Sequence, residues 1–408
     1  MSKLKALSWL SNVCFVAGFV IPLVASGYIG MSLYKHPGIT IMNALLWAAG
    51  LIISYLAHLE EKKYPATIPA WIRIANFITA TPATIVFLGL IWGYVYYPTM
   101  QTSVFVTWVN VPLILSLFVC GILINKSHWV HIVKHPAVVG YTVLLRWVVP
   151  AAIAYILGHL ILSRFMPQPA GNILSIGMLV LATTPTGPAS NTMTLISRGE
   201  LALSVSVTAI NNIIAPFVQP ILLTILGASF VGHIDASSIF KELMEIALAP
   251  VIVGSIVGGY FPEQVKKIRP ALGAVAVVCL TFIMLANISK GSGTLLKQLW
   301  ILPWMLGACA VQAVGCLTAG FYISKYLGFT MKERVAATFN VAVENASLAT
   351  VVAINHFGVL AALPAVFYGK MQHVFGIGIF VRKFQNMPEL AEEQQQVLEP
   401  EPELANVR

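Results

Sequence analysis

Two apolar stretches of the chain are each interrupted by small polar residues that could hold an ion or a small solute. The first, LATTPTGPASNTMTLIS, places Pro185 and Pro188 beside Thr186, Ser190 and Asn191. Two prolines three residues apart remove backbone donors and clash with the preceding turn, so a helix is expected to open there. The carbonyl groups of an opened helix, together with hydroxyl and amide oxygens, can coordinate a cation.

The second stretch, FNVAVENASLATVVAINHF, carries Asn340, Glu344, Asn345 and Ser347 inside an apolar frame. A helix that breaks here would present the N-terminus of its second half, and helix N-termini favour anions. The two stretches together therefore predict a site for a polar or charged solute. The alternative is that these small residues only allow helices to pack closely.

The composition indicates that the elements carrying these residues lie in lipid. Hydrophobic residues make up 58% of the 408 residues and charged residues only 10%, whereas soluble domains carry about 25% charged residues. The net charge of +9 comes from basic residues scattered between apolar runs, which is typical of membrane topology and argues against a nucleic-acid partner. The five cysteines have no CxxC spacing, so neither a disulfide framework nor a metal site is expected.

The sequence predicts an all-α polytopic membrane protein with twelve spans, since a helix needs about 20 apolar residues to cross the hydrocarbon. The spans are expected at about 7–33, 40–58, 71–96, 103–124, 137–163, 171–196, 201–227, 240–260, 270–288, 299–323, 333–356 and 359–381. With this count, most basic loop residues fall on the side of the N-terminus, as the positive-inside rule requires. Both termini are therefore expected in the cytoplasm, and the location is a cell inner or plasma membrane.

The two interrupted spans occupy corresponding places in the chain. Spans three to seven, about 71–227, and spans eight to twelve, about 240–382, form two five-helix repeats, and the interrupted helix is the fourth of each. Paired discontinuous helices in inverted repeats mark the binding site of many transporters. Residues 1–70 then form two additional N-terminal helices and 71–382 a ten-helix transporter unit, while 383–408 form a disordered acidic cytoplasmic tail.

Four motifs at these places resemble the bile acid:sodium symporter family, within the bile, arsenite and riboflavin transporter superfamily. They are KHPAVVG at Lys134–Gly140, TGPASN at Thr186–Asn191, SRGELALSVSVT at Ser197–Thr208 and NVAVENASL at Asn340–Leu348. The resemblance covers about residues 71–382. It implies a panel domain and a core domain with two crossing broken helices, and transport by alternating access as one domain moves against the other.

The resemblance also implies the residues of a sodium-like site. The first sodium site of the family maps to Ser190, Asn191, Ser204 and Thr208, and Asn340 stands where the family has a glutamate. Ser204 and Thr208 are one helical turn apart, so their hydroxyls share a face that can meet the first break. Because Asn340 leaves the site neutral, we expect one coupled Na⁺ ion or none, and no other cofactor.

Two further residues depart from the family pattern. Arg146 and Glu344 stand at positions where the resemblance implies glutamines of a second sodium site. The planar guanidinium fork suits a carboxylate, and burying either charge without the other would be strongly destabilising. We therefore expect Arg146 and Glu344 to pair, with the guanidinium in the place of the second sodium ion. A cation fixed by covalent bonds cannot be transported, so this site would add no ion coupling.

Lys370 is, with Arg146 and Glu344, one of three charged residues placed well inside the predicted spans and away from their ends. A charge at the centre of a lipid-facing helix costs at least about 2.5–3.5 kcal/mol, so Lys370 should face the interior. The alternative is that it lies shallow enough for its stem to reach the interface.

The leading functional hypothesis is a secondary active transporter of a small organic anion, with Thr186, Gly187, Asn345 and Ser347 as substrate-binding residues. An oxyanion (arsenite-like) efflux permease is an alternative, but it would favour a reactive cysteine, and neither broken helix has one. The acidic tail leaves open a non-transporting receptor or scaffold. An enzyme is not expected, because the sequence has no HExxH or GxSxG motif and no paired intramembrane carboxylates.

Overall fold

A computed structural model describes residues 37–62, 68–80, 110–124, 133–297, 300–387 and 389–390. Throughout these residues the chain is helical, apart from turns and one isolated antiparallel bridge between Thr186 and Glu344. The chain divides into two compact units, the first made of residues 1–119 and 261–296 and the second of residues 120–260 and 297–408. The predicted span at 7–33 and the later part of the span at 71–96 lie outside the described residues.

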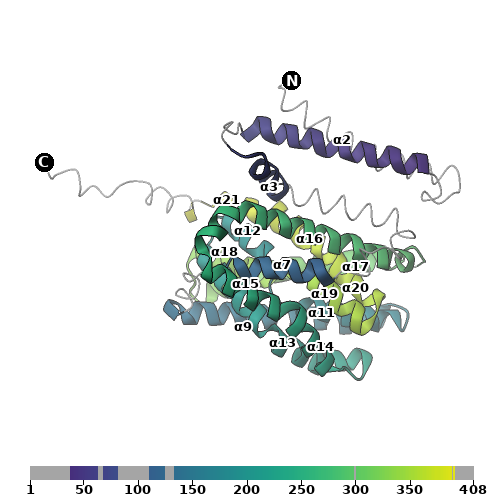
Figure 1. Ribbon diagram of the computed structural model, residues 1–408. Coiled ribbons are helices and arrows are strands. Elements are labelled where there is room, and N and C mark those ends of the chain that lie inside the picture. The colour runs from purple at the N-terminus through teal and green to yellow at the C-terminus, as the bar shows by residue number, and fades with distance from the viewer. Residues whose placement is uncertain are drawn as a thin grey trace. The chain divides into compact units, whose positions relative to one another are not determined.

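The first unit contains four described helices at places where spans are predicted. They are α2 (Pro37–Lys62), α3 (Ala70–Ala80), most of α7 (Asn110–Ile122) and nearly all of α16 (Pro262–Lys297) (Figure 1). The rings of Tyr55 and Phe77 lie edge to face with centroids 5.3 Å apart, which joins α2 to α3. Helix α16 begins at Pro262, a residue type favoured in the first turn, and extends beyond both ends of the predicted span at 270–288.

The second unit holds the other described helices, and three of its long segments pass through short π-helical stretches. In chain order they are α9 (Pro136–Leu157), η2 (Gly158–Leu162), α10 (Ser163–Phe165), α11 (Ala170–Ala182), α12 (Ala189–Ile196), α13 (Leu201–Val231), α14 (Ala236–Glu242), η3 (Leu243–Leu248), α15 (Ala249–Tyr260), α17 (Ile301–Tyr326), α18 (Met331–Ala342), α19 (Ala346–Phe357), α20 (Val359–Phe375), η4 (Gly376–Val381) and α21 (Arg382–Gln385). These helices and the short breaks between them carry every residue of the predicted site.

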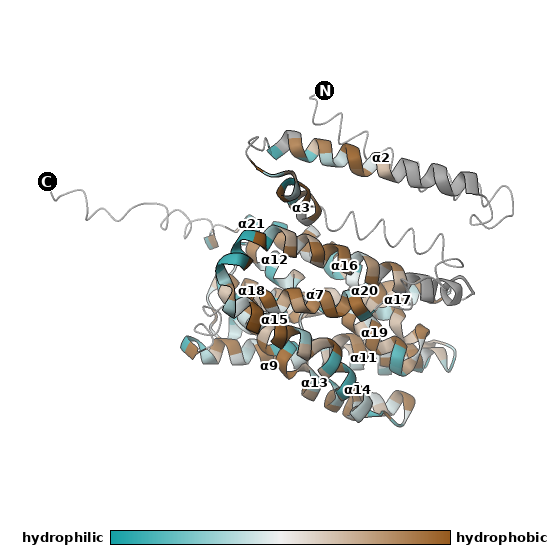
Figure 2. Ribbon diagram, in the orientation of Figure 1, coloured by the Kyte–Doolittle hydropathy of each residue, from teal (hydrophilic) through white to brown (hydrophobic). Residues whose placement is uncertain are grey.

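Several of these segments have the length and surface of membrane-spanning helices. Among the described residues, four are long and apolar enough to cross a bilayer: Pro136–Phe165, Leu201–Val231, Ala236–Tyr260 and Ile301–Tyr326. Their outward side chains are apolar as well, since Leu144 is 57% and Ile225 69% exposed. Figure 2 shows brown, hydrophobic residues along most of α15. Water would disfavour so much exposed apolar surface, so this is an integral membrane protein.

Both predicted helix breaks are present. One helix stops at Ala182 and resumes at Ala189, which separates α11 from α12. The other stops at Ala342 and resumes at Ala346, which separates α18 from α19. Proline explains the first break, because it removes backbone donors and clashes with the preceding turn. The second break contains neither proline nor glycine, so contacts with the rest of the fold must impose it.

A close helix crossing joins the first broken helix to the last long helix. A Cβ atom added to Gly177 on α11 would lie 2.1 Å from the backbone oxygen of Ala361 on α20. No side chain fits at this distance, so the crossing depends on glycine. Small residues at such crossings are how membrane helices approach one another closely.

The C-terminal segment is ordered further than the sequence predicts. Disorder is predicted from residue 383, but α21 covers Arg382–Gln385, and both Phe384 and Leu390 are buried in a hydrophobic cluster of the second unit. The sequence predicts disorder here because the tail as a whole is acidic and has few apolar residues. Burial of Phe384 and Leu390 offsets the entropy cost of ordering the segment. Residues 391–408 lie outside the described residues.

We expect Gly177→Ala to lower the melting temperature of the purified protein, at a cost of about 1–3 kcal/mol, because the added methyl group overpacks the crossing. Gly140 is a matched control, since it is an exposed helical glycine on α9 with no atom within 4 Å of an added Cβ. Gly140→Ala should be neutral or stabilise by up to about 1 kcal/mol. Equal melting temperatures for the two variants would contradict a tight crossing at Gly177.

Candidate functional site at the crossing of two broken helices

The two breaks cross as a short piece of antiparallel strand. The backbone N–H of Gly187 donates to the carbonyl of Val343 at 2.9 Å, and the N–H of Asn345 donates to the carbonyl of Pro185 at 3.1 Å. These bonds satisfy backbone groups that neither helix can satisfy itself, as a non-aqueous interior requires. A Cβ atom on Gly187 would lie 2.7 Å from the carbonyl oxygen of Glu344, so the close approach requires glycine at this position.

Arg146 connects both breaks from α9. The side chain is fully buried, and its Nη1 donates to the carbonyl of Ala182 at 3.1 Å. Its Nη2 is hydrogen-bonded to the carbonyl of Thr184 and forms an ion pair with Oε2 of Glu344. The two carbonyls belong to the C-terminal end of α11, where helical carbonyls lack partners and the helix dipole favours a cation. Arg146 and Glu344 thus pair as the sequence predicts, and the guanidinium also caps α11.

Two residues of α20 stabilise the second break, and the sequence does not predict their role. The side-chain amide of Gln372 accepts from the N–H of Glu344 at 2.9 Å and donates to the carbonyl of Glu344 at 3.3 Å. The hydroxyl of Tyr368 donates to the carbonyl of Ala342 at 2.7 Å. Together these contacts take the place of the helical hydrogen bonds that α18 and α19 lose between them.

The first break has a corresponding polar support that is also absent from the sequence prediction. Asn211 on α13 donates through Nδ2 to the hydroxyl of Thr186 at 2.9 Å, and accepts from the indole N–H of Trp147 at 2.9 Å. The Thr186 hydroxyl in turn donates to the carbonyl of Asn340 at 3.2 Å. Asn211 is one of several polar residues on α13, and only the three-dimensional structure shows that it is the one that supports the first break.

The five residues predicted to form a cation site lie together in one cluster, in which all but the partly exposed Asn191 are buried. Ser204 donates to Oδ1 of Asn191 at 2.7 Å, and Thr208 lies 3.3 Å from the same oxygen. Asn340 donates through Nδ2 to the Ser204 hydroxyl at 2.8 Å, while its Oδ1 lies 3.3 Å from the Thr208 hydroxyl. The Ser190 hydroxyl is 3.4 Å from that of Thr208. The cluster is rich in hard oxygen ligands but contains no carboxylate.

The residues predicted to bind substrate all lie at the crossing. Thr186 is fully buried, and Asn345 and Ser347 are 8% and 6% exposed. Asn345 is the N-cap of α19, where its Oδ1 accepts from the N–H of Leu348 at 3.2 Å. Since α12 and α19 both begin at the crossing, two helix N-termini meet there, which is an arrangement that favours negative charge.

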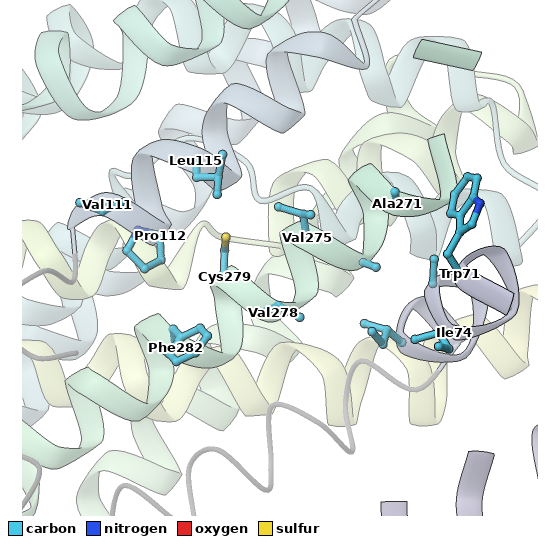
Figure 3. A pocket seen from close by; sticks show the side chains of 13 residues that line it. Trp71, Ile74, Val111, Pro112, Leu115, Ala271, Val275, Val278, Cys279 and Phe282 are labelled. Atoms are coloured by element: carbon cyan, nitrogen blue, oxygen red, sulfur yellow. The ribbon is translucent and has the colours of Figure 1, made fainter. Parts of the chain in front are cut away.

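A cavity of about 570 Å³ in the first unit differs in character from this crossing. It is bounded by α3, α7 and α16, and Figure 3 shows Trp71, Leu115 and Phe282 among its lining residues. Apart from the Trp71 indole and the Cys279 thiol, its lining side chains are purely apolar. Such a cavity offers no group that would bind a polar solute, so the crossing is the better candidate site.

Comparison with known proteins finds one family match and several similar sequences. Residues 110–298 match the model of the Sodium Bile acid symporter family. The chain is 26% identical over 305 residues to the uncharacterized sodium-dependent transporter YocS of Bacillus subtilis (strain 168), which covers 74% of this chain and 91% of that protein.

Plant proteins are similar over a comparable length. The probable sodium/metabolite cotransporter BASS1, chloroplastic, of Arabidopsis thaliana is 25% identical over 322 residues, covering 78% of this chain and 76% of that protein. The probable sodium/metabolite cotransporter BASS2, chloroplastic, of Oryza sativa subsp. japonica is 24% identical over 343 residues, covering 82% and 78%. Residues 110–298 are therefore similar to the Sodium Bile acid symporter family, and the relatives that match most of the chain are named as transporters.

Proposed function

We propose that this protein is a secondary active transporter that carries a small organic anion across the membrane by alternating access. The observation that carries the proposal is the crossing of two broken helices, with buried polar groups and two helix N-termini at one place. Irregular backbone at membrane depth is tolerated where it lines a solute site. The names of the relatives, sodium-dependent transporter and sodium/metabolite cotransporter, agree with this class of function.

The proposed architecture has twelve spans in which about 71–227 and 240–382 form inverted five-helix repeats, preceded by two further helices within residues 1–70. Two observations support it. Each break falls in the fourth helix of its repeat, and each is supported by a polar side chain from the fifth, Asn211 on α13 and Gln372 on α20. Both termini then lie in the cytoplasm, and the membrane is an inner or plasma membrane.

The coupling ion is proposed to be Na⁺, bound by the cluster of Ser190, Asn191, Ser204, Thr208 and Asn340. The cluster has three hydroxyl and two amide oxygens, each within hydrogen-bond distance of at least one other, and these side chains can rotate to face a cation. Because the cluster has no carboxylate, it holds at most one monovalent ion, and weakly. The ion and the anion would then move together, with Thr186, Gly187, Asn345 and Ser347 next to the anion.

The guanidinium of Arg146 is proposed to stand where a second cation would otherwise bind. Its partners are two backbone carbonyls at the open end of α11 and one carboxylate oxygen of Glu344, which is also a ligand set suited to a metal cation. Because the guanidinium is covalently attached to the chain, this tethered cation neutralises Glu344 permanently. Sodium dependence should therefore be first order or absent.

The first test is sodium-dependent uptake of labelled carboxylates into proteoliposomes, with sodium and pH varied separately. We expect a hyperbolic dependence on sodium, and Thr208→Val should raise the half-saturating concentration about tenfold or more because one oxygen ligand is lost. Thr224→Val is the matched control, since Thr224 lies on the same helix and, like Thr208, donates to the carbonyl four residues earlier.

Two outcomes would contradict parts of this proposal. A steep second-order dependence on sodium would contradict the tethered cation, and an unchanged sodium dependence in Thr208→Val would contradict the assigned cluster. Counterflow of a labelled carboxylate in the absence of a gradient would establish carrier function independently of coupling. No counterflow with any carboxylate would contradict transport of organic anions.

The second test is a double-mutant cycle on the buried ion pair. Arg146→Gln and Glu344→Gln should each destabilise the protein by about 3–5 kcal/mol, since each leaves an uncompensated buried charge, and the double variant should lose less than the sum. Arg334→Gln combined with Glu344→Gln is the control, because Arg334 instead lies over the ring of Phe321, 4.0 Å from its centroid. That combination should be additive within about 0.5 kcal/mol.

The single variant Arg146→Gln also tests whether the guanidinium stands in the place of a bound cation. Removing it leaves the Glu344 carboxylate and the carbonyls of α11 without a cation, so sodium should raise the melting temperature of Arg146→Gln more than that of the unmodified protein. Equal sodium responses would argue that the pair is purely structural.

A further inference from the structure

A polar bridge joins the second broken helix to the helix that begins the second predicted repeat. Nδ2 of Asn355 donates to Oε1 of Glu242 at 2.5 Å, and Nε2 of His356 lies 2.5 Å from the other carboxylate oxygen. An ionised carboxylate only accepts hydrogen bonds, so Nε2 carries the proton of this contact. Glu242 is the last residue of α14, whereas Asn355 and His356 lie in the last turn of α19. One carboxylate therefore holds the ends of two separate helices together.

The bridge lies at the end of α19 that is remote from the crossing. Residues 346–353 of this helix are buried, whereas Asn355 is exposed. From Ala346 at the crossing to His356 the helix rises about 15 Å, which is about half the thickness of the hydrocarbon. In the proposed topology, the connection that precedes α14 and the one that follows α19 both lie outside the cell. The bridge is thus placed at the outer surface of the membrane.

Helix α14 contacts its two neighbours in different ways. Towards α13 it packs through aromatic rings, since Phe240 and Phe217 lie edge to face with centroids 5.5 Å apart. The connection between α13 and α14 is only residues 232–235, so these two helices stay adjacent. Towards α19 it presents Glu242, whose side chain is 12% exposed. Hydrogen bonds near water can be exchanged for bonds to water at a small net cost, so the contact with α19 is the one that can open.

The chain directly after Glu242 provides a means of movement. The π-helical stretch η3 begins at Leu243 and ends at Leu248. Such stretches are rare and frequently occur at functional sites. If η3 returned to α-helical bonding by a shift of one residue, the turn before it would rotate by about 100°. That rotation would carry the Glu242 carboxylate away from its two partners on α19.

We propose that the bridge of Glu242, Asn355 and His356 is a latch that closes the outer end of the pathway to the crossing and opens in each transport cycle. This inference rests on the proposed function, because alternating access requires that the crossing be shut off from one side of the membrane while it faces the other. With the latch closed, α14 lies against the outer half of the second broken helix and shields the crossing from outside. With the latch open, the anion and its coupled ion reach the crossing beside α19.

The first experiment ties the latch shut. In Glu242→Cys combined with His356→Cys, a short bis-methanethiosulfonate cross-linker should stop counterflow of a labelled carboxylate in proteoliposomes, and reduction of the link should restore it. Phe217→Cys with Phe240→Cys is the matched control, because its link ties α14 to α13 and should leave counterflow unchanged. Mass spectrometry verifies each link. Counterflow that continues at the same rate in the protein linked between 242 and 356 would overturn the inference.

The second experiment needs no substrate. Ser347→Cys places a thiol at the crossing, and a membrane-impermeant maleimide added to intact cells measures how often this thiol faces outside, above the background of the unmodified protein. Adding Glu242→Ala should speed the labelling about tenfold, because the open latch gains population. Adding Lys241→Ala, a change at an exposed neighbour on the same helix, should not.

Equal labelling rates in these two double variants would overturn the latch. The labelling also separates the latch from the proposed function. If labelling depends on Glu242 but the unmodified protein shows no counterflow with any carboxylate, the proposed substrate is contradicted and the latch is not.

Discussion

The ion pair between Arg146 and Glu344 lies where two helices stop inside a protein that is surrounded by lipid. A stopped helix leaves carbonyl and amide groups without partners, and lipid offers none. The guanidinium binds the carbonyl of Ala182 at the end of α11, the carbonyl of Thr184 just after it, and one carboxylate oxygen of Glu344, which follows α18. One side chain thereby fixes both broken helices, and the positions of the oxygen cluster and of the two helix N-termini depend on it.

The two breaks are similar in form and different in charge. Each is supported by one side-chain amide, from Asn211 at the first and from Gln372 at the second. The first break supplies only neutral oxygens, whereas the second supplies the carboxylate of Glu344, and the Arg146 guanidinium binds to both breaks. Permanent charges therefore hold the two breaks together, and only neutral oxygens are left for the exchangeable ion of the proposed function.

The sequence predicts the parts of this arrangement that have a local cause. Prolines at 185 and 188 open the first break, the spacing of Ser204 and Thr208 puts both hydroxyls on one face, and the complementary charges of Arg146 and Glu344 indicate their pairing. It does not predict Asn211, Trp147, Gln372 or Tyr368, because the partner of each is distant in the chain and no local pattern marks it. The burial of Phe384 and Leu390 is missed for a similar reason, since their packing partners belong to other helices.

The lack of proline or glycine between α18 and α19 bears on how the chain assembles in the membrane. Nothing local prevents residues 331–357 from inserting as one continuous helix, and a continuous helix satisfies its own backbone in lipid. The groups that break it come from both sides of the sequence, with Arg146 synthesised earlier and Gln372 later. The crossing should therefore be a late event of biogenesis, completed only after the last helix has joined the bundle.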